Sequence, residues 1–395
     1  MKKISHGGNI YKKAKEMGIR EEDILDFSAN ISPLGLPEHI RKAMIEAIDG
    51  TINYPDPDCS RLKEAISKQD NVPESHITCG NGGADLLYRL AFGLHPKKVL
   101  LPAPAFVEYE EALSAAGAQM EYYLMRDDFV IKEDILEQIT EETDFVVICN
   151  PNNPTGHSIT LSEMKKISEA FKDIPVIFDE AYMEFGKESA VCLLKEYPNV
   201  FVCRTLSKAY GLAGIRCGFM ISSQVEKLSA LFIPYALSSV TQTIASVVLR
   251  HADEYKDTIA TIISERERMY QEVKEFKQLT MYPSNANFLF GRSEKKDLLL
   301  AMFKEKNITI LMVTHHMEEV ILADRIIVMD QGKIVMDGKP KEIFSRVDEM
   351  KALGLEVPYA TELAWELKKE GVNLSDTITT KEELVEELCQ LKLKM

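Results

Sequence analysis

Short apolar runs bounded by turn residues recur along the chain between residues 77 and 221. They include VLL, FVVIC, VIF, VFVC and GFMI, and helical patterns lie between them. Runs of this length are typical of buried strands. Strands that alternate with helices predict an α/β fold, with a doubly wound, mostly parallel sheet that has helices on both faces.

Longer periodic segments divide the rest of the chain. Residues 59–69 read as one helix, and residues 239–276 read as a long amphipathic helix without proline that leads into a second, smaller domain. SNANFLFGR predicts a strand of that domain, and KKDLLLAMFKEKN predicts its following helix. We therefore expect an N-terminal arm at 1–35, a large domain at 36–250, a small α+β domain at 251–308 and an atypical α/β appendage at 309–395.

Composition narrows the class of protein. The formal net charge of −15 argues against a nucleic-acid partner, because phosphate binding needs a basic patch. The seven cysteines are scattered and lack the spacing of a metal site, which indicates a reducing compartment. The start MKKISHGG lacks the apolar core of a signal peptide, and no run approaches the ~18 apolar residues of a spanning helix. We expect a cytoplasmic protein without membrane insertion.

The segment Arg204–Gly218, RTLSKAYGLAGIRCG, carries the first candidate chemistry. A lysine is usually a solvated surface charge, but the apolar runs on both sides of this segment favour a buried Lys208. Burial lowers the pKa of an amine, and a partly neutral Lys208 could hold an aldehyde cofactor. Small neighbours such as Ser207 leave room for a ring and a phosphate, which Arg216 could grip with a bidentate fork.

Three further polar residues follow predicted strands. Asp179 and Tyr182 end the run IPVIFDEAYMEF, and Asn153 follows FVVIC in the loop NPNNPTG. Open α/β sheets bind ligands at the carboxyl ends of their strands. Taken singly, Asp179 is equally well interpreted as a helix cap and Asn153 as a turn residue.

A glycine-rich turn predicts an anion site. The segment HITCGNGGADLLYRLAFGL passes from a strand through Asn81, Gly82 and Gly83 into a helix. Free backbone N–H groups and the positive end of the helix dipole at such a turn favour a phosphate. The glycine spacing differs from that of the dinucleotide fingerprint. Phe106 begins the next predicted helix, where plain core packing is the alternative to a role at the site.

In this order and spacing, the candidate residues resemble the fold type I aminotransferase family, which uses pyridoxal phosphate (PLP). The resemblance implies that Lys208 carries PLP and that Asp179 pairs with the nitrogen of its ring. Tyr182 and Asn153 are then donors to the ring oxygen, and Phe106 stacks on the ring. The residues around the phosphate would be Asn81, Gly82, Gly83, Thr205, Ser207, Arg216 and Tyr54 from the other subunit. A homodimer follows from the role of Tyr54.

Three short segments bear on the substrate. HGGN, SANISPLG and YPDPD resemble the threonine-phosphate decarboxylases of cobalamin biosynthesis more than the histidinol-phosphate aminotransferases. That resemblance implies a small, phosphorylated amino acid as substrate, with His6, Asn30 and Asn153 helping to bind it. The group that holds the substrate carboxylate decides between loss of that carboxylate and transamination.

The resemblance ends after Ile310. The sequence ILMVTHHMEEVILADRIIVMDQGKIVMDG resembles the last part of an ABC-transporter ATPase, in which His315 would be the switch histidine. VPYATELAWELKKEG resembles the C-terminal extension of energy-coupling factor ATPases. No phosphate-binding loop or signature motif is present in the sequence, so this part is interpreted as a structural appendage. We expect a hairpin around Gln331 and Gly332, helices near 362–369 and 381–391, and no metal at His315 and His316.

This replacement affects the functional prediction. Family members bind the substrate carboxylate with an arginine in the part that is replaced, so turnover is expected to be impaired. Arg89 and Arg292 are possible substitutes that the sequence alone does not place. An alternative function is a catalytically defective fusion whose tail contacts a transporter subunit. A further alternative is an accidental join of two neighbouring genes.

Overall fold

The computed structural model describes residues 10–11, 20–21, 29–138, 140–231, 233–276, 279–293, 317–321, 323, 325–330, 333–353 and 355–392. His6, His315, the expected helix after residue 293 and the junction between the two family resemblances lie outside these residues. The chain divides into two compact units, which are His6–Lys296 and a unit made of Met1–Ser5 with Asp297–Met395.

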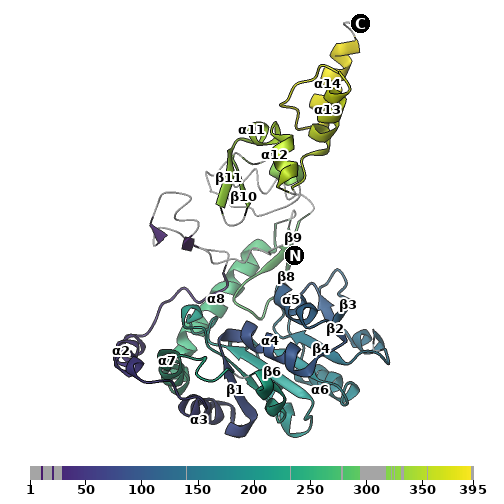
Figure 1. The fold of residues 1–395 in the computed structure, drawn as a ribbon. Helices are drawn as coiled ribbons and strands as arrows, with labels where there is room; N and C mark the ends of the chain where they lie inside the picture. Colours follow the sequence, from purple (N-terminus) through teal and green to yellow (C-terminus); the bar gives the residue numbers. More distant parts are fainter. Residues whose placement is uncertain are drawn as a thin grey trace. The chain divides into compact units, whose positions relative to one another are not determined.

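A seven-stranded sheet organises the unit His6–Lys296, with the strand order β1-β7-β6-β5-β4-β2-β3 (Figure 1). The strands are β1 (Ile77–Gly80), β2 (Lys98–Ala103), β3 (Gln119–Leu124), β4 (Phe145–Cys149), β5 (Val176–Asp179), β6 (Val200–Thr205) and β7 (Gly218–Ile221). Strands β2 to β6 are mutually parallel, whereas β7 is antiparallel to both of its neighbours. The predicted mostly parallel sheet is confirmed.

Helices connect and cover the strands of this sheet (Figure 1). The α-helices of the unit are α2 (Glu38–Ala47), α3 (Ser60–Asp70), α4 (Gly82–Leu94), α5 (Val107–Ala115), α6 (Leu161–Ala170), α7 (Ser239–Arg250) and α8 (Lys256–Val273). The 3-10 segments are η2 (Ile48–Ile52), η3 (Glu74–His76), η4 (Glu133–Gln138), η5 (Met183–Phe185), η6 (Ala190–Lys195), η7 (Ala213–Ile215), η8 (Val225–Leu231) and η9 (Ala252–Tyr255).

The central strands bury side chains on both faces of the sheet. Along β4, Val146 and Ile148 belong to one apolar cluster, while Phe145 and Val147 belong to another. Since successive side chains of a strand point to opposite faces, a strand buried on both faces must be apolar at every position. The continuous run FVVIC therefore becomes a central strand.

The prediction of one continuous helix over residues 239–276 is wrong, because the structure divides this segment into two helices. Helix α7 ends at Arg250, η9 follows, and α8 begins at Lys256. The break accompanies burial of Tyr255, whose ring packs edge-on against Tyr210 with 5.0 Å between the ring centroids. Absence of proline therefore did not ensure one helix, because tertiary packing overrides weak local preferences. Beyond α8, β8 (Thr280–Tyr282) and β9 (Phe290–Arg292) pair antiparallel.

The C-terminal unit contains its own small apolar clusters. Strands β10 (Ile326–Asp330) and β11 (Lys333–Gly338) pair antiparallel, as the expected hairpin requires, and helices α10 (Met317–Val320), α11 (Pro340–Phe344) and α12 (Val347–Ala352) accompany them. Helices α13 (Tyr359–Lys369) and α14 (Lys381–Lys392) cover both predicted helical segments. Among the described residues, no helix is both long and apolar enough to cross a membrane.

Candidate active site

The candidate residues meet at one edge of the sheet because strand register aligns the ends of β4, β5 and β6. Cys149, Asp179 and Cys203 are register partners across these strands. Asn153, Tyr182 and Lys208 follow the three strand ends in the sequence. The edge predicted from the polar residues at strand ends therefore exists, since parallel neighbours bring their carboxyl ends together.

The glycine-rich turn packs against the segment that carries Arg216. Gly218 is the register partner of both Gly80 and Thr205, so the end of β1 lies beside the beginning of β7. A Cβ atom on Gly82, whose φ is +84°, would lie 2.5 Å from Arg216 Nη2. The guanidinium of Arg216 therefore rests on the first residue of α4. Two sources of positive potential, the guanidinium and the helix N-terminus, meet there and fit an anion.

Polar side chains surround this anion site. Buried Thr205 and Ser207 place their hydroxyl oxygens 2.9 Å apart, and the Ser207 N–H donates to Thr205 Oγ1 at 3.2 Å. Asn81 donates from its side chain to the Ala236 carbonyl at 3.2 Å. Gly83 is the second residue of α4, and a Cβ atom added there would lie 3.9 Å from Cys203 Sγ, an ordinary van der Waals contact.

Lys208 has the electrostatic setting of a reactive amine. Burial lowers the pKa of Lys208, the positive charge of Arg216 lowers it further, and the charge of Asp179 opposes both effects. Its Nζ atom lies 5.3 Å from the centroid of the Tyr182 ring. The Ser32 N–H donates to the Lys208 carbonyl at 3.0 Å, which ties the N-terminal segment to this turn. A neutral amine is the nucleophilic form, so the setting suits covalent attachment of an aldehyde.

Asp179 is buried and has a partner that the sequence interpretation missed. The Tyr109 hydroxyl donates to Asp179 Oδ2 at 2.7 Å, and the Ala181 N–H donates to Oδ1 at 3.0 Å. Burial raises the pKa of Asp179, while the two hydrogen bonds and Lys208 favour its charged form. Tyr109 lies on α5 just beyond Phe106, whose half-buried ring meets it edge-on at 5.7 Å. Helical spacing from Phe106 was the signal that could have identified Tyr109.

Tyr182 connects the N-terminal segment to the sheet edge. Asn30 Nδ2 donates to the Tyr182 hydroxyl at 3.3 Å, and Phe288 packs edge-on against the Tyr182 ring at 5.2 Å. Burial raises the pKa of Tyr182, so its hydroxyl keeps its proton and remains a donor. Asn153 is half-buried in the turn after β4.

A buried charge network behind the site was also missed. Arg204 donates to Asp70 Oδ1 at 2.7 Å and to Glu180 Oε2 at 3.0 Å, and the three side chains are almost inaccessible to solvent. Glu180 directly follows Asp179, and Arg204 lies beside it on β6. A paired, hydrogen-bonded network in low dielectric holds its members rigidly. It therefore fixes the backbone that presents Asp179.

Three residues from the sequence prediction lie elsewhere or have other partners. Tyr54 is 84% exposed, and its ring lies tilted against that of Tyr235, with 4.9 Å between the ring centroids, so it lies on the surface of its own chain. Buried Arg89 forms a salt bridge with Asp85, and Arg292 forms one with Asp127. Neither arginine presents an unpaired guanidinium for a substrate carboxylate.

The residues present fit PLP. A flat pyridine ring that carries a phosphate arm, an aldehyde and a basic nitrogen opposite the aldehyde needs an anion site, an amine and a carboxylate at one edge. Gly82 with Arg216 provides the first, Lys208 the second and Asp179 the third. Phe106, Asn153 and Tyr182 follow β2, β4 and β5 in the sequence, around the same edge of the sheet.

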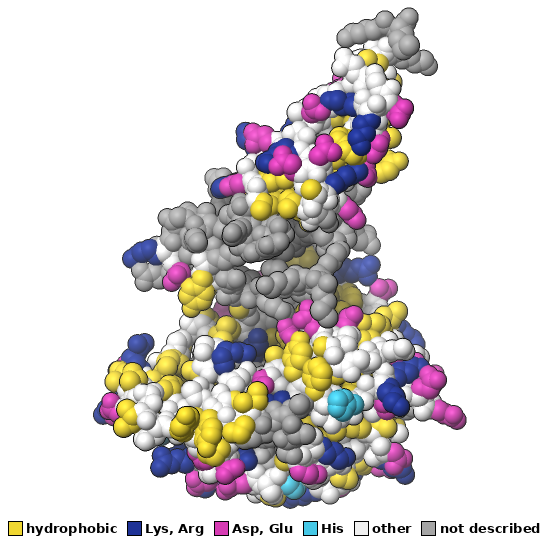
Figure 2. Space-filling model, viewed as in Figure 1, with side chains coloured by type: hydrophobic (Ala, Val, Ile, Leu, Met, Phe, Trp, Pro, Cys, Tyr) yellow, Lys and Arg dark blue, Asp and Glu magenta, His cyan; other side chains and the backbone are white. Residues whose placement is uncertain are grey.

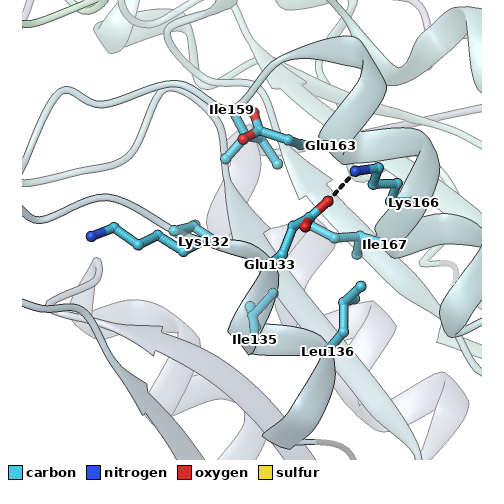
Figure 3. Close-up of a pocket in the computed structure, with 9 residues that line it drawn as sticks. Lys132, Glu133, Ile135, Leu136, Ile159, Glu163, Lys166 and Ile167 are labelled. Atoms are coloured by element: carbon cyan, nitrogen blue, oxygen red, sulfur yellow. Dashed lines mark hydrogen bonds and ion pairs between the residues drawn. The ribbon is translucent and has the colours of Figure 1, made fainter.

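A hollow elsewhere in the unit does not belong to this site. It is a small surface hollow that is lined by residues of the segment around η4, such as Ile131 and Leu136, and by residues at and before α6 (Figure 3). Figure 3 shows the ion pair between Glu133 and Lys166, two of the residues that line it. None of the residues that gather at the carboxyl edge of the sheet line it.

The fold and site define a PLP-dependent enzyme. A family model described as aminotransferase class I and II matches residues 22–334, and the chain belongs to this family. A second model, described as the energy-coupling factor transporter EcfA1 C-terminal domain, matches residues 358–395. The first match confirms the expected aminotransferase family and PLP as the cofactor, and the second confirms the expected resemblance of the C-terminal extension to energy-coupling factor proteins. The aminotransferase match extends to residue 334, past Ile310, where this resemblance was expected to end.

Individual relatives give the same family with two different activities. The chain is 32% identical over 303 residues to the threonine-phosphate decarboxylase of Salmonella typhimurium, covering 74% of this chain and 83% of that one. It is 37% identical over 299 residues to the histidinol-phosphate aminotransferase of Methanocella arvoryzae, covering 73% of this chain and 80% of that one. The fold resembles that of the Sinorhizobium meliloti histidinol-phosphate aminotransferase in complex with PLP, with a TM-score of 0.68, 23% identity and coverage of 78% and 87%.

Proposed function

We propose that the chain is a PLP-dependent decarboxylase of a small phosphorylated amino acid, most like the L-threonine-O-3-phosphate decarboxylases of cobalamin biosynthesis. The contact between Asn30 and the Tyr182 hydroxyl carries the proposal. Asn30 belongs to SANISPLG, one of the segments that resemble the decarboxylases, and its side chain lies at the candidate active site. The similarity to the Salmonella typhimurium decarboxylase supports the same activity.

Lys208 and the anion site are proposed to hold the cofactor. Lys208 provides the amine, and burial, which lowers its pKa, increases the share of the neutral form that attacks an aldehyde. Arg216, Thr205, Ser207 and the first N–H groups of α4 are proposed to bind the phosphate, since hydroxyls, free amides and a guanidinium all donate to it. Asn81 is proposed to fix the turn through its bond to Ala236.

Asp179 and its partners are proposed to set the charge of the cofactor ring. When bound, PLP supplies an electron sink for the bond that breaks at the α-carbon of the substrate. Asp179, whose charged form is favoured by the hydrogen bond from Tyr109, is proposed to stabilise a proton on the ring nitrogen. Tyr182 and Asn153 donate to the ring oxygen, and Phe106 covers a ring face. Lys208 is the group proposed to move a proton at the α-carbon.

Selection of the breaking bond depends on the group that orients the substrate carboxylate. His6, Asn30 and Asn153 are proposed to bind the substrate. Arg89 and Arg292 are paired with acidic residues, so neither replaces the arginine of family members. A charge-assisted hydrogen bond contributes roughly 1.5–3 kcal/mol, and its loss lowers substrate use by about tenfold or more. Impaired turnover is therefore part of the proposal.

A homodimer is also proposed, with Tyr54 donating to the cofactor phosphate of the partner subunit. Large apolar side chains are exposed along the segment from residue 34 to residue 54 and again at residues 233 and 235, and the rings of Tyr54 and Tyr235 are in contact. The seven side chains are Leu34, Ile45, Ile48, Ile52, Tyr54, Ile233 and Tyr235. Figure 2 shows apolar side chains gathered at the side of the unit where α2 lies. Exposed apolar patches of this kind are typical of protein interfaces.

The reaction can be tested directly with purified full-length protein loaded with PLP. It is incubated with O-phospho-threonine, histidinol phosphate and common amino acids, and carbon dioxide and keto acids are both measured. Carbon dioxide from O-phospho-threonine supports the decarboxylase, provided that Lys208→Ala abolishes it. Turnover of the other amino acids alone, without release of carbon dioxide, contradicts the proposal.

A second candidate is a histidinol-phosphate-type aminotransferase. The 37% identity to the Methanocella arvoryzae enzyme favours it. In that reaction the C–H bond of the substrate, rather than the bond to its carboxylate, breaks at the α-carbon. Keto-acid acceptors consumed together with histidinol phosphate, in the same incubations, would support this candidate.

A third candidate is a transporter-associated binding protein with a defective catalytic site. The match of residues 358–395 to a transporter ATPase domain favours it. Co-purification of the full chain with membrane transporter subunits, lost when residues 358–395 are removed, would support it. Equal recovery of transporter subunits with the full chain and with the chain that lacks residues 358–395 would contradict this candidate.

A further inference from the structure

Two histidines and a glutamate from separate elements meet on the surface of the unit His6–Lys296. His39 lies on α2, His251 follows the last residue of α7, and Glu254 lies in η9. One ligand-type atom from each residue lies within 4.8 Å of the other two. All three side chains are between 37% and 47% exposed, so an ion can reach them from solvent.

The local backbone explains why these side chains converge. His251 and Glu254 are three residues apart around a 3-10 turn, where side chains at that spacing lie over one another. His251 Nδ1 lies 2.8 Å from Glu254 Oε1, and His39 Nδ1 lies 3.4 Å from Glu254 Oε2. The two imidazole rings are 4.9 Å apart and tilted by 56°, so they do not stack face to face.

These distances match the geometry of a tetrahedral ion. Zinc binds imidazole nitrogen and carboxylate oxygen at about 2.0–2.2 Å, which places neighbouring ligands roughly 3.4 Å apart. Both nitrogen–oxygen separations are within reach of that value by small rotations of the side chains. Imidazole with one carboxylate is a ligand set for zinc or another late first-row divalent ion, whereas magnesium and calcium prefer oxygen alone.

We propose that His39, His251 and Glu254 form a binding site for zinc or a similar divalent transition-metal ion, with water completing the coordination. The bound ion joins α2 to the end of α7. The segment before α2 contains Ser32 and Asn30, which contact Lys208 and Tyr182. Metal binding therefore stabilises the helix that follows the N-terminal contacts to the active site. The sequence offered no sign of this site, because His39 is more than 200 residues away from His251 and Glu254.

Calorimetric titration of untagged, full-length, PLP-loaded protein with zinc chloride tests the proposal. We expect saturable binding of one ion per chain, binding at least tenfold weaker in His39→Ala and in His251→Ala, and little competition from excess magnesium. Zinc should raise the melting temperature of the wild type and leave that of both variants unchanged, since only a ligand of the folded state stabilises it. Melting temperatures of His39→Ala and His251→Ala that equal that of the wild type in the absence of zinc would show that both variants fold.

Control variants separate this site from the other histidines. His95→Asn, which alters an exposed histidine outside the cluster, and the double variant His315→Ala/His316→Ala should both bind zinc as the wild type does. Absence of saturable binding, undiminished binding in both cluster variants, or loss confined to the His315/His316 variant would each overturn the proposal. Zinc affinity is measured independently of turnover, so failure here leaves the proposed decarboxylation untouched.

Discussion

The Tyr109 hydroxyl donates a 2.7 Å hydrogen bond to Asp179 Oδ2, and both side chains are buried. Burial raises the pKa of Asp179, and the hydrogen bond from Tyr109 is the largest effect that opposes this rise. The charge of the carboxylate at the sheet edge therefore depends on a residue of α5, which approaches from a different part of the chain. The relationship makes Tyr109 a positioning residue whose effect acts through Asp179.

Tyr109→Phe should weaken PLP binding about tenfold, because the lost hydrogen bond to a charged group is worth roughly 1.5–3 kcal/mol. The measurement is an absorbance titration of cofactor-free protein with PLP. Tyr123→Phe is the matched control, since Tyr123 donates to Asp134 in the same way away from the site. Equal losses in the two variants would exclude a specific role for Tyr109.

Gly82→Ala should weaken PLP binding by at least tenfold. A Cβ atom at Gly82 would lie 2.5 Å from Arg216 Nη2 and would displace the guanidinium from the start of α4. Gly117→Ala controls for backbone strain, because Gly117 has φ +92° but no heavy atom within 4 Å of its added Cβ. Each variant should lose on the order of 1–3 kcal/mol of stability. Only Gly82→Ala should change the PLP titration. Unaltered PLP binding in Gly82→Ala would show that the contact between Gly82 and the Arg216 guanidinium is not needed for cofactor binding.

Arg216→Gln should shift the reactivity of Lys208 to higher pH. The charge of Arg216 lowers the pKa of Lys208, so its removal raises that pKa and leaves less neutral amine at a given pH. Pyridoxal without a phosphate isolates this effect, because it does not need Arg216 for binding. The rate of its reaction with cofactor-free protein is followed by absorbance against pH. Arg250→Gln, at an exposed salt bridge with Glu64, should leave the dependence of this rate on pH unchanged. A shift of the rate profile to lower pH in Arg216→Gln would contradict the effect assigned to Arg216.

Glu184→Gln should make the protein more resistant to unfolding above neutral pH. Burial raises the pKa of Glu184 to about 7, and Glu180 and Asp70 act in the same direction against Arg204. A carboxyl whose folded pKa exceeds its unfolded pKa contributes stability at low pH, and that contribution is lost as pH rises toward 7.

Chemical denaturation of wild type and Glu184→Gln at pH 5 and pH 8 measures this difference. Between pH 5 and pH 8, the free energy of unfolding of the wild type should fall by on the order of 1–3 kcal/mol more than that of Glu184→Gln. Glu141→Gln, at an exposed position, serves as the control and should behave as the wild type. A variant that loses as much as the wild type would show that Glu184 ionises normally.

The apolar runs and the order of turn residues were enough to predict the sheet, its mostly parallel strands and the edge that carries Lys208. A run such as FVVIC, apolar at every position, can only be buried on both faces, so its place in the centre follows from local sequence. The hairpin of β10 with β11 was predicted from the turn around Gln331 and Gly332, and helices α13 and α14 were predicted as well. The break after α7 was not, since burial of Tyr255 depends on Tyr210, which is distant in sequence.

By itself, the sequence determined the strands, the helices and the chemical types of the residues at their ends, because these follow from short-range periodicity and from each side chain's own chemistry. Only the tertiary structure decided that Tyr109 supports Asp179 and that Arg204 joins Asp70 to Glu180. It also brought His39 to His251 and Glu254. The physical reason is that a hydrogen bond or salt bridge between distant residues depends on strand register and helix packing, which set the distances between side chains.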